Sequence, residues 1–132
     1  MKHLINFETD LFNSTESKPH FINDRCFGED LIAWLIANFS DHTFVLDEPF
    51  QEDWGWATLA RRGKETFLIG AGIMDESIGT APAEWIIIVE KMRRFMIFGS
   101  KKFANLAVLS DSIEKTLQGE DRINDIRRSI EQ

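Results

Sequence analysis

A stripe of four apolar residues at positions i, i+3, i+4 and i+7 predicts a helix over residues 28–39. The four are Ile32, Leu35, Ile36 and Phe39. Glu29 and Asp30 lie in the first turn, where carboxylates complement the positive end of the helix dipole. Because Leu31 and Trp34 widen the stripe, we expect this helix to be covered on two sides, by a sheet and by an N-terminal arm, another helix or a partner subunit.

Four further segments have the alternation or the short apolar runs of β-strands. They are residues 43–46, 53–61, 65–72 and 84–92. In the last of these, the run from Trp85 to Val89 is apolar on both faces, which predicts a central strand with a layer on each side. Residues 95–98 fit a fifth strand and a helical turn equally well.

The two ends of the chain carry the remaining expected elements. Residues 1–27 are expected to form an extended arm that includes a short edge strand at residues 4–7. A second helix should run over residues 101–118 and stop at Gly119. The tail over residues 120–132 has apolar positions that fit either a helix or an edge strand.

Together these elements predict a single α+β domain over residues 1–132. The sheet should be antiparallel with four to five strands, and the helix of the N-terminal half and the C-terminal helix should pack on one face of it. No linker, repeat or low-complexity stretch divides the chain, and 132 residues are enough to bury a core.

The expected strand over residues 53–61 contains the most distinctive motif of the chain. Trp54 and Trp56 are two residues apart, so on an extended strand they would stand side by side, beneath the helix that begins at Gly28. Gly55 would face the other way and would allow another backbone to approach. Two such rings can form core or anchor a partner, and core packing is the more common use.

Carboxylates next to these rings suggest where a partner would bind. Glu52 and Asp53 would attract a basic group, and an arginine of the partner would add a cation–π contact. The alternative is that both acids pair with Arg25, Arg61 or Arg62 of the chain itself. With the acidic loop that follows the third strand, the candidate binding residues are Glu52, Asp53, Trp54, Trp56, Asp75 and Glu76.

The formal net charge of −7 is unevenly distributed. Residues 1–60 hold 11 acidic and 3 basic side chains, whereas residues 61–132 hold 11 and 12. An acidic half repels phosphate backbones, so we expect no nucleic acid partner and favour a basic protein partner. The apolar runs are too short to span a bilayer, the N-terminus lacks a secretory signal and there is one cysteine, so a cytoplasmic location is expected.

No group of residues has the spacing of a catalytic, metal or cofactor site. Cys26 lies near His20 and Asp24, but such groups meet in space rather than along the chain, and a partly buried, unreactive thiol is the favoured interpretation. The sequence around Gly70 and Gly72 lacks the following helix that a phosphate-binding loop requires. We therefore expect no catalytic residues, no metal ligands and no cofactor.

Two blocks resemble a scattered group of small bacterial proteins of unassigned function. These blocks are Arg25-Cys26-Phe27-Gly28-Glu29-Asp30-Leu31-Ile32-Ala33-Trp34-Leu35 and Glu52-Asp53-Trp54-Gly55-Trp56. The resemblance covers about residues 20–92 and implies that the acidic helix start and the tryptophan strand meet in the fold. It carries over no activity.

Three hypotheses for function follow from the sequence. The first is a non-enzymatic domain that docks a basic protein through its acidic N-terminal half, as the immunity proteins of bacterial toxin systems do; this rests on class analogy. The second is a small-ligand binder or enzyme with a pocket between the first helix and the tryptophans, with Glu52 or Asp53 paired to Arg25 or Arg61. The third is a structural homodimer formed through the first helix.

Overall fold

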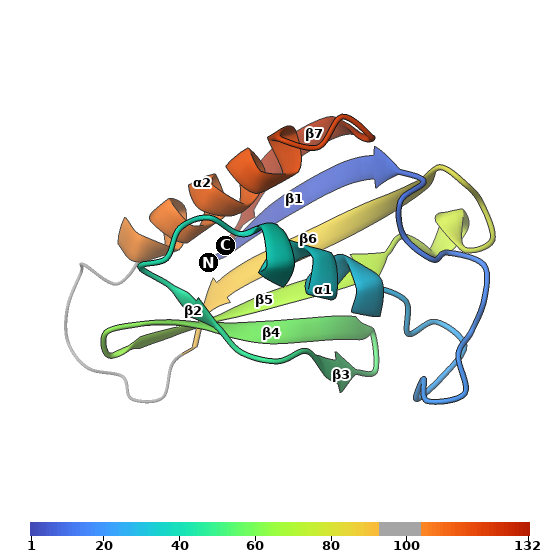
Figure 1. Ribbon diagram of the computed structural model, residues 1–132, viewed down its shortest axis with the longest axis horizontal. Coiled ribbons are helices and arrows are strands. Elements are labelled where there is room, and N and C mark those ends of the chain that lie inside the picture. Colours follow the sequence, from blue (N-terminus) through green and yellow to red (C-terminus); the bar gives the residue numbers. More distant parts are fainter. Residues whose placement is uncertain (93–103) are drawn as a thin grey trace.

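The computed structural model describes residues 1–92 and 104–132. In this part of the chain, seven strands form one antiparallel sheet and two α-helices lie on one face of it (Figure 1). The strands are β1 (Lys2–Thr9), β2 (Val45–Leu46), β3 (Phe50–Glu52), β4 (Gly55–Arg62), β5 (Glu65–Ile73), β6 (Ala83–Lys91) and β7 (Ile123–Glu131). The helices are α1 (Glu29–Asn38), the 3-10 turn η1 (Asp75–Ser77) and α2 (Ala104–Gln118).

The strand order is β2-β4-β5-β6-β1-β7, and β3 pairs with β4 on the same side as β2. The predicted α+β class, antiparallel sheet and two packed helices are confirmed, but the sheet has more strands than the four to five expected. The proposed element at residues 95–98 lies outside the described residues, as do the first residues of the predicted second helix.

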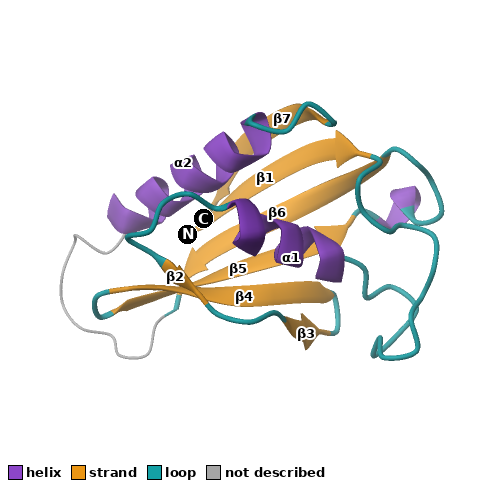
Figure 2. Ribbon diagram, viewed as in Figure 1, coloured by secondary structure: helices purple, strands orange, loops and turns teal. Residues whose placement is uncertain are grey.

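One face of the sheet and the two helices enclose the core. Every second residue of the long strands points to this inner face, as Phe7, Ile69 and Ile87 do, all of them fully buried. Helix α1 packs over β4 and β5, and α2 packs over β6, β1 and β7. Figure 2 shows both helices in front of the sheet.

Helix α1 has the predicted bounds within one residue and the predicted second cover. Its buried residues are Leu31, Ile32 and Leu35. On the flank of α1, the Trp34 ring meets the Phe12 ring edge-on with centroids 5.9 Å apart. Phe12 belongs to the segment between β1 and α1, so part of the expected N-terminal arm supplies that cover.

Both chain ends differ from the expectations for them. Residues 4–7 were expected at an edge, but β1 is longer and lies inside the sheet, with β6 on one side and β7 on the other. The tail is the strand β7, which decides between the two alternatives for residues 120–132. β1 is internal because it pairs with the tail of the chain, more than a hundred residues away. The local sequence of β1 contains no signal for a pairing at that distance.

Candidate functional site

The turn between β3 and β4 separates the two tryptophans of the motif. Glu52 pairs with Gly55, so Asp53 and Trp54 form a two-residue turn instead of the start of a strand. The turn interrupts the alternation on which the side-by-side arrangement of Trp54 and Trp56 depended, and that prediction is wrong. The two rings lie on opposite faces of the sheet.

Trp56 is a core residue on the inner face. Its side chain is 6% exposed, and its Nε1–H donates a hydrogen bond of 2.8 Å to the carbonyl of Cys26. The edges of the His20 and Phe21 rings pack against the indole. A buried indole needs an acceptor for its N–H, and the residues before α1 supply one. Trp56 therefore fixes the start of α1 onto β4 and is not available to a partner.

Trp54 lies on the outer face, which no described helix covers. Its ring sits over Gly70 of β5, and a methyl group added to Gly70 would come within 2.9 Å of the ring atom Cζ3. Ala71 of β5 is the cross-strand partner of Trp56, so the two side chains share one face of the sheet. Successive residues of a strand point to opposite faces, so Gly70 lies on the face opposite to Trp56. The absence of a side chain at Gly70 gives the indole its place, and 41% of Trp54 remains exposed.

The two motif blocks meet at one carbonyl group of β5. A Cβ atom added to Gly28 would lie 2.8 Å from the Ala71 oxygen, and one added to Gly55 would lie closer still. Gly28 also has a φ of 125°, which residues with a side chain rarely adopt. This confirms the expectation that the helix start and the tryptophan strand come together, and it gives both glycines a packing role.

Residues 20–27 join the β3–β4 turn to η1 at one end of the sheet. Asn23 donates a hydrogen bond of 2.9 Å to the carbonyl of Asp53, and Arg25 forms an ion pair of 2.9 Å with Asp75. Most of the predicted acidic residues therefore lie near one another. We call this group the acidic end; its members are Asp24, Glu29, Glu52, Asp53, Asp75 and Glu76.

The expected pairing of Glu52 and Asp53 with arginines of the chain does not occur as proposed. Arg25 binds Asp75, and Arg61 binds Asp47 at 2.9 Å. The Arg62 guanidinium lies over the Phe44 ring. Asp53 and Glu76 are exposed, and no ion pair involves either of them within residues 1–92 and 104–132. Their carboxylates are thus open to a partner.

The thiol and imidazole in this region do not form a catalytic pair. Cys26 is fully buried and its Sγ donates to the carbonyl of Glu52 at 3.1 Å. Burial raises the pKa of Cys26, and the charges of Asp53 and Glu29 raise it further. Because only the thiolate is a good nucleophile, both the burial and the raised pKa disfavour reaction of this thiol, which is fully buried where a partly buried one was predicted.

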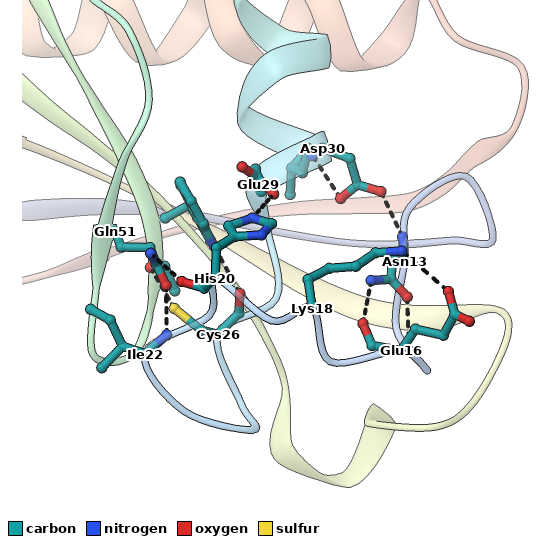
Figure 3. A network of polar contacts seen from close by, with 12 residues as sticks. Asn13, Glu16, Lys18, His20, Ile22, Cys26, Glu29, Asp30 and Gln51 are labelled. Atoms are coloured by element: carbon teal, nitrogen blue, oxygen red, sulfur yellow. Dashed lines mark hydrogen bonds and ion pairs between the residues drawn. The ribbon is translucent and has the colours of Figure 1, made fainter.

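His20 belongs to a separate polar network at the start of α1 (Figure 3). Its Nε2 lies 2.7 Å from the Glu29 carboxylate, and its carbonyl accepts a hydrogen bond from Gln51 Nε2. Gln51 in turn accepts from the backbone N–H of Ile22. These contacts fasten residues 20–22 to β3 and α1, which gives the network a structural role. It also shows how a loop far from β3 in sequence reaches the β3–β4 turn.

The region offers no metal site within the residues described. Among residues 1–92 and 104–132, no three His, Cys, Asp or Glu side chains are grouped so that they could hold an ion. No helix in the same residues is long and apolar enough to cross a membrane. Near the start of α1 and β4, where the sequence suggested a ligand pocket, the Phe21 ring packs against the rings of Phe27 and Trp56.

Comparison with known proteins adds no relative: no family model, no curated protein and no solved structure matches this chain.

Proposed function

We propose that the chain is a non-enzymatic protein-binding domain that docks a basic partner at its acidic end. The observation that carries the proposal is the convergence of six carboxylates from three separate segments at one end of the sheet. Arg25, which lies among them, is already paired with Asp75. A region of one sign attracts an oppositely charged partner and accelerates its association.

The shape of the acidic end supports the same function. Its carboxylates stand on the loop before α1, the first turn of α1, the β3–β4 hairpin and η1, and hydrogen bonds and an ion pair join these segments, so they are held in place before binding. A surface that needs little ordering loses less free energy on association. Immunity-type and regulatory proteins are classes that act by such docking, and the chain fits either of them by size and charge.

Charge reversal at the acidic end tests the proposal. Asp53→Lys and Glu76→Lys alter exposed carboxylates without breaking an ion pair, and Asp121→Lys makes the same charge change at the exposed turn between α2 and β7. Proteins captured by the immobilised chain from extracts of the native cell would be identified, and each would be titrated at low and high salt. We expect each acidic-end variant to weaken binding about tenfold at low salt, and Asp121→Lys to leave it unchanged. Equal binding by all four proteins, or no salt dependence, would contradict the proposal.

A further inference from the structure

The outer face of the sheet carries a continuous apolar surface. Cross-strand pairing aligns Leu4 with Ile88, Ile88 with Gly70, and Gly70 with Ala57, so one row of side chains crosses four strands. Neighbouring rows add further aliphatic side chains and Trp54 covers the glycine. We call this surface the helix-free face; its large apolar members are Leu4, Trp54, Leu59, Leu68, Ile86 and Ile88.

We propose that two copies of this chain pack through their helix-free faces to form a homodimer. The inference does not depend on the proposed function, since the acidic end lies at the end of the sheet and the contact would be made by its face. The dimer would place two sheets face to face, about 10 Å apart, with the helices of each copy on the outside.

The sequence of β6 requires a second layer that the described chain does not supply. Trp85, Ile87 and Val89 are buried on the inner face, whereas Ile86 and Ile88 point outward and stay partly exposed. A strand with water on one face normally alternates apolar and polar residues, and a strand apolar on both faces is normally covered on both. The predicted second layer over β6 is absent within residues 1–92 and 104–132, and a second copy would supply it.

The distribution of charge on the helix-free face favours a second copy at its centre, where no charged side chain lies. Its outward charged side chains on the long strands are three basic and five acidic, and the Asp47 carboxylate adds a sixth negative charge beside Arg61, a balance of −3 in a chain of −7. Those on the long strands are Lys2, Arg61, Arg127, Glu8, Glu84, Glu90, Asp125 and Glu131. Lys2 pairs with Glu90, and Arg127 with Glu84. The row through Ile88 carries no charge, and the basic side chains of this face are already paired with its carboxylates, so two copies can meet at its centre without the repulsion that the acidic ends would generate.

The size of the helix-free face matches what a stable dimer needs. The strands β4, β5, β6, β1 and β7 contain eight or nine residues each. At about 3.3 Å per residue and about 4.8 Å between strands, the face measures on the order of 600–700 Å². Stable interfaces bury about 800 Å² on each partner, so a contact over this face and its rim is of ordinary size. The exposed indole of Trp54 provides the kind of rigid aromatic anchor that dominates such contacts.

Measurement of mass in solution tests the dimer. The full chain would be examined by light scattering and sedimentation velocity from low to high micromolar concentration. We expect the wild-type mass to reach twice the 15.3 kDa of one chain. Ile88→Lys buries a charge at the centre of the contact and should raise the dimer dissociation constant at least about 100-fold. Ile88→Ser, a milder change at the same position, should raise it by a smaller factor.

Matched controls separate the contact from a general effect of lost apolar surface. Val108→Lys and Ile130→Lys make the same kind of change at residues that are 40% and 57% exposed on α2 and β7, at positions that are not on the helix-free face. Both should remain dimeric, as should Asp53→Lys at the acidic end. Far-UV circular dichroism would establish that each variant is folded. A monomeric wild type at every concentration, or a folded Ile88→Lys variant that dimerises like the wild type, would overturn the proposal.

Discussion

Replacing Gly70 with alanine should displace the Trp54 indole from the outer face of the sheet. The added methyl group would lie 2.9 Å from Cζ3 of the ring and 3.4 Å from Cζ2, with Cη2 nearer than either. The obstructing atoms are the outer edge of a side chain that is 41% exposed, so the ring can move away while the backbone stays in place. The variant should therefore fold, with Trp54 more exposed to water.

The loss of stability in the Gly70→Ala variant follows from the apolar area of the indole that becomes exposed to water. A partly buried indole removes on the order of 100 Å² from water, which at about 25 cal/mol/Å² is an upper limit of about 2.5 kcal/mol. Since displacement is partial, we expect Gly70→Ala to lower the free energy of unfolding by about 1–2 kcal/mol. Trp54→Ala should lower it by about 2 kcal/mol. In the Trp54→Ala background the added methyl group meets no ring, and alanine should be neutral or up to about 1 kcal/mol better than glycine in a strand.

A double-mutant cycle measures this coupling. Urea unfolding of the four proteins would be followed by far-UV circular dichroism at one protein concentration, because dimer formation would add to the measured stability. Gly119→Ala serves as the control, since its methyl group would meet nothing closer than 3.4 Å. We expect a coupling energy of about 2 kcal/mol between positions 54 and 70 and none between 54 and 119. Additive effects, with coupling below about 0.5 kcal/mol, would refute the placement of Trp54 over Gly70.

Three further predictions concern other parts of the fold. Gly55→Ala places a methyl group against backbone atoms of β5, which cannot move aside, so it should cost about 3 kcal/mol in urea unfolding. Burial and then the Arg128 charge lower the pKa of His3 below 6.5; its contribution to stability is therefore complete above pH 6.5 and is lost as the pH falls through the folded-state pKa. His3→Phe should reduce the loss of stability between pH 7.5 and pH 5, and an unchanged pH profile would contradict this. The Nε1–H of Trp85 is buried without an acceptor among the described residues, whereas that of Trp56 has one. Trp85→Phe should accordingly cost about 1–2 kcal/mol less than Trp56→Phe in thermal or urea unfolding, and the reverse order would refute the reasoning.

Local patterns in the sequence predicted much of the fold. The helical stripe around Leu35 gives α1, and the apolar run around Ile87 gives β6, because each pattern has a single period over a whole element. Gly119 ends α2 as expected, its N–H donating to the carbonyl of Lys115. The position of β1 inside the sheet was missed because its partner β7 is the tail of the chain, and pairing at that distance leaves no local signal.

The arrangement of the tryptophans was also missed, although a signal for it exists. Residues 52–55 form a four-residue turn with a glycine at its last position, where glycine is favoured in type I turns. The predicted single strand over residues 53–61 does not include this turn, and for that reason it placed Trp54 and Trp56 on the same face. The observed positions of the two rings change which residues a partner could contact. Trp56 belongs to the core and Trp54 to the helix-free face, so the proposed acidic binding surface contains the carboxylates but neither tryptophan.

The central outward residues of β6 are apolar although the described chain leaves them partly exposed, and such a mismatch can indicate a binding surface. The sequence predicts a layer over Ile86 and Ile88, and the described chain leaves both partly exposed. A contiguous apolar patch on the surface of a folded domain marks an interaction surface. The dimer proposal rests on this contrast between the sequence and the fold.

The measurement that tests the central claim most directly is a nuclear Overhauser spectrum of the labelled chain. The claim is that Trp54 and Trp56 lie on opposite faces of the sheet, one over Gly70 and one bonded to the Cys26 carbonyl. We predict cross-peaks from the Trp54 ring protons to the Gly70 Hα protons, and from the Trp56 ring to Phe21. Cross-peaks between the two indole rings, or from Trp54 to Leu35 of α1, would contradict the account.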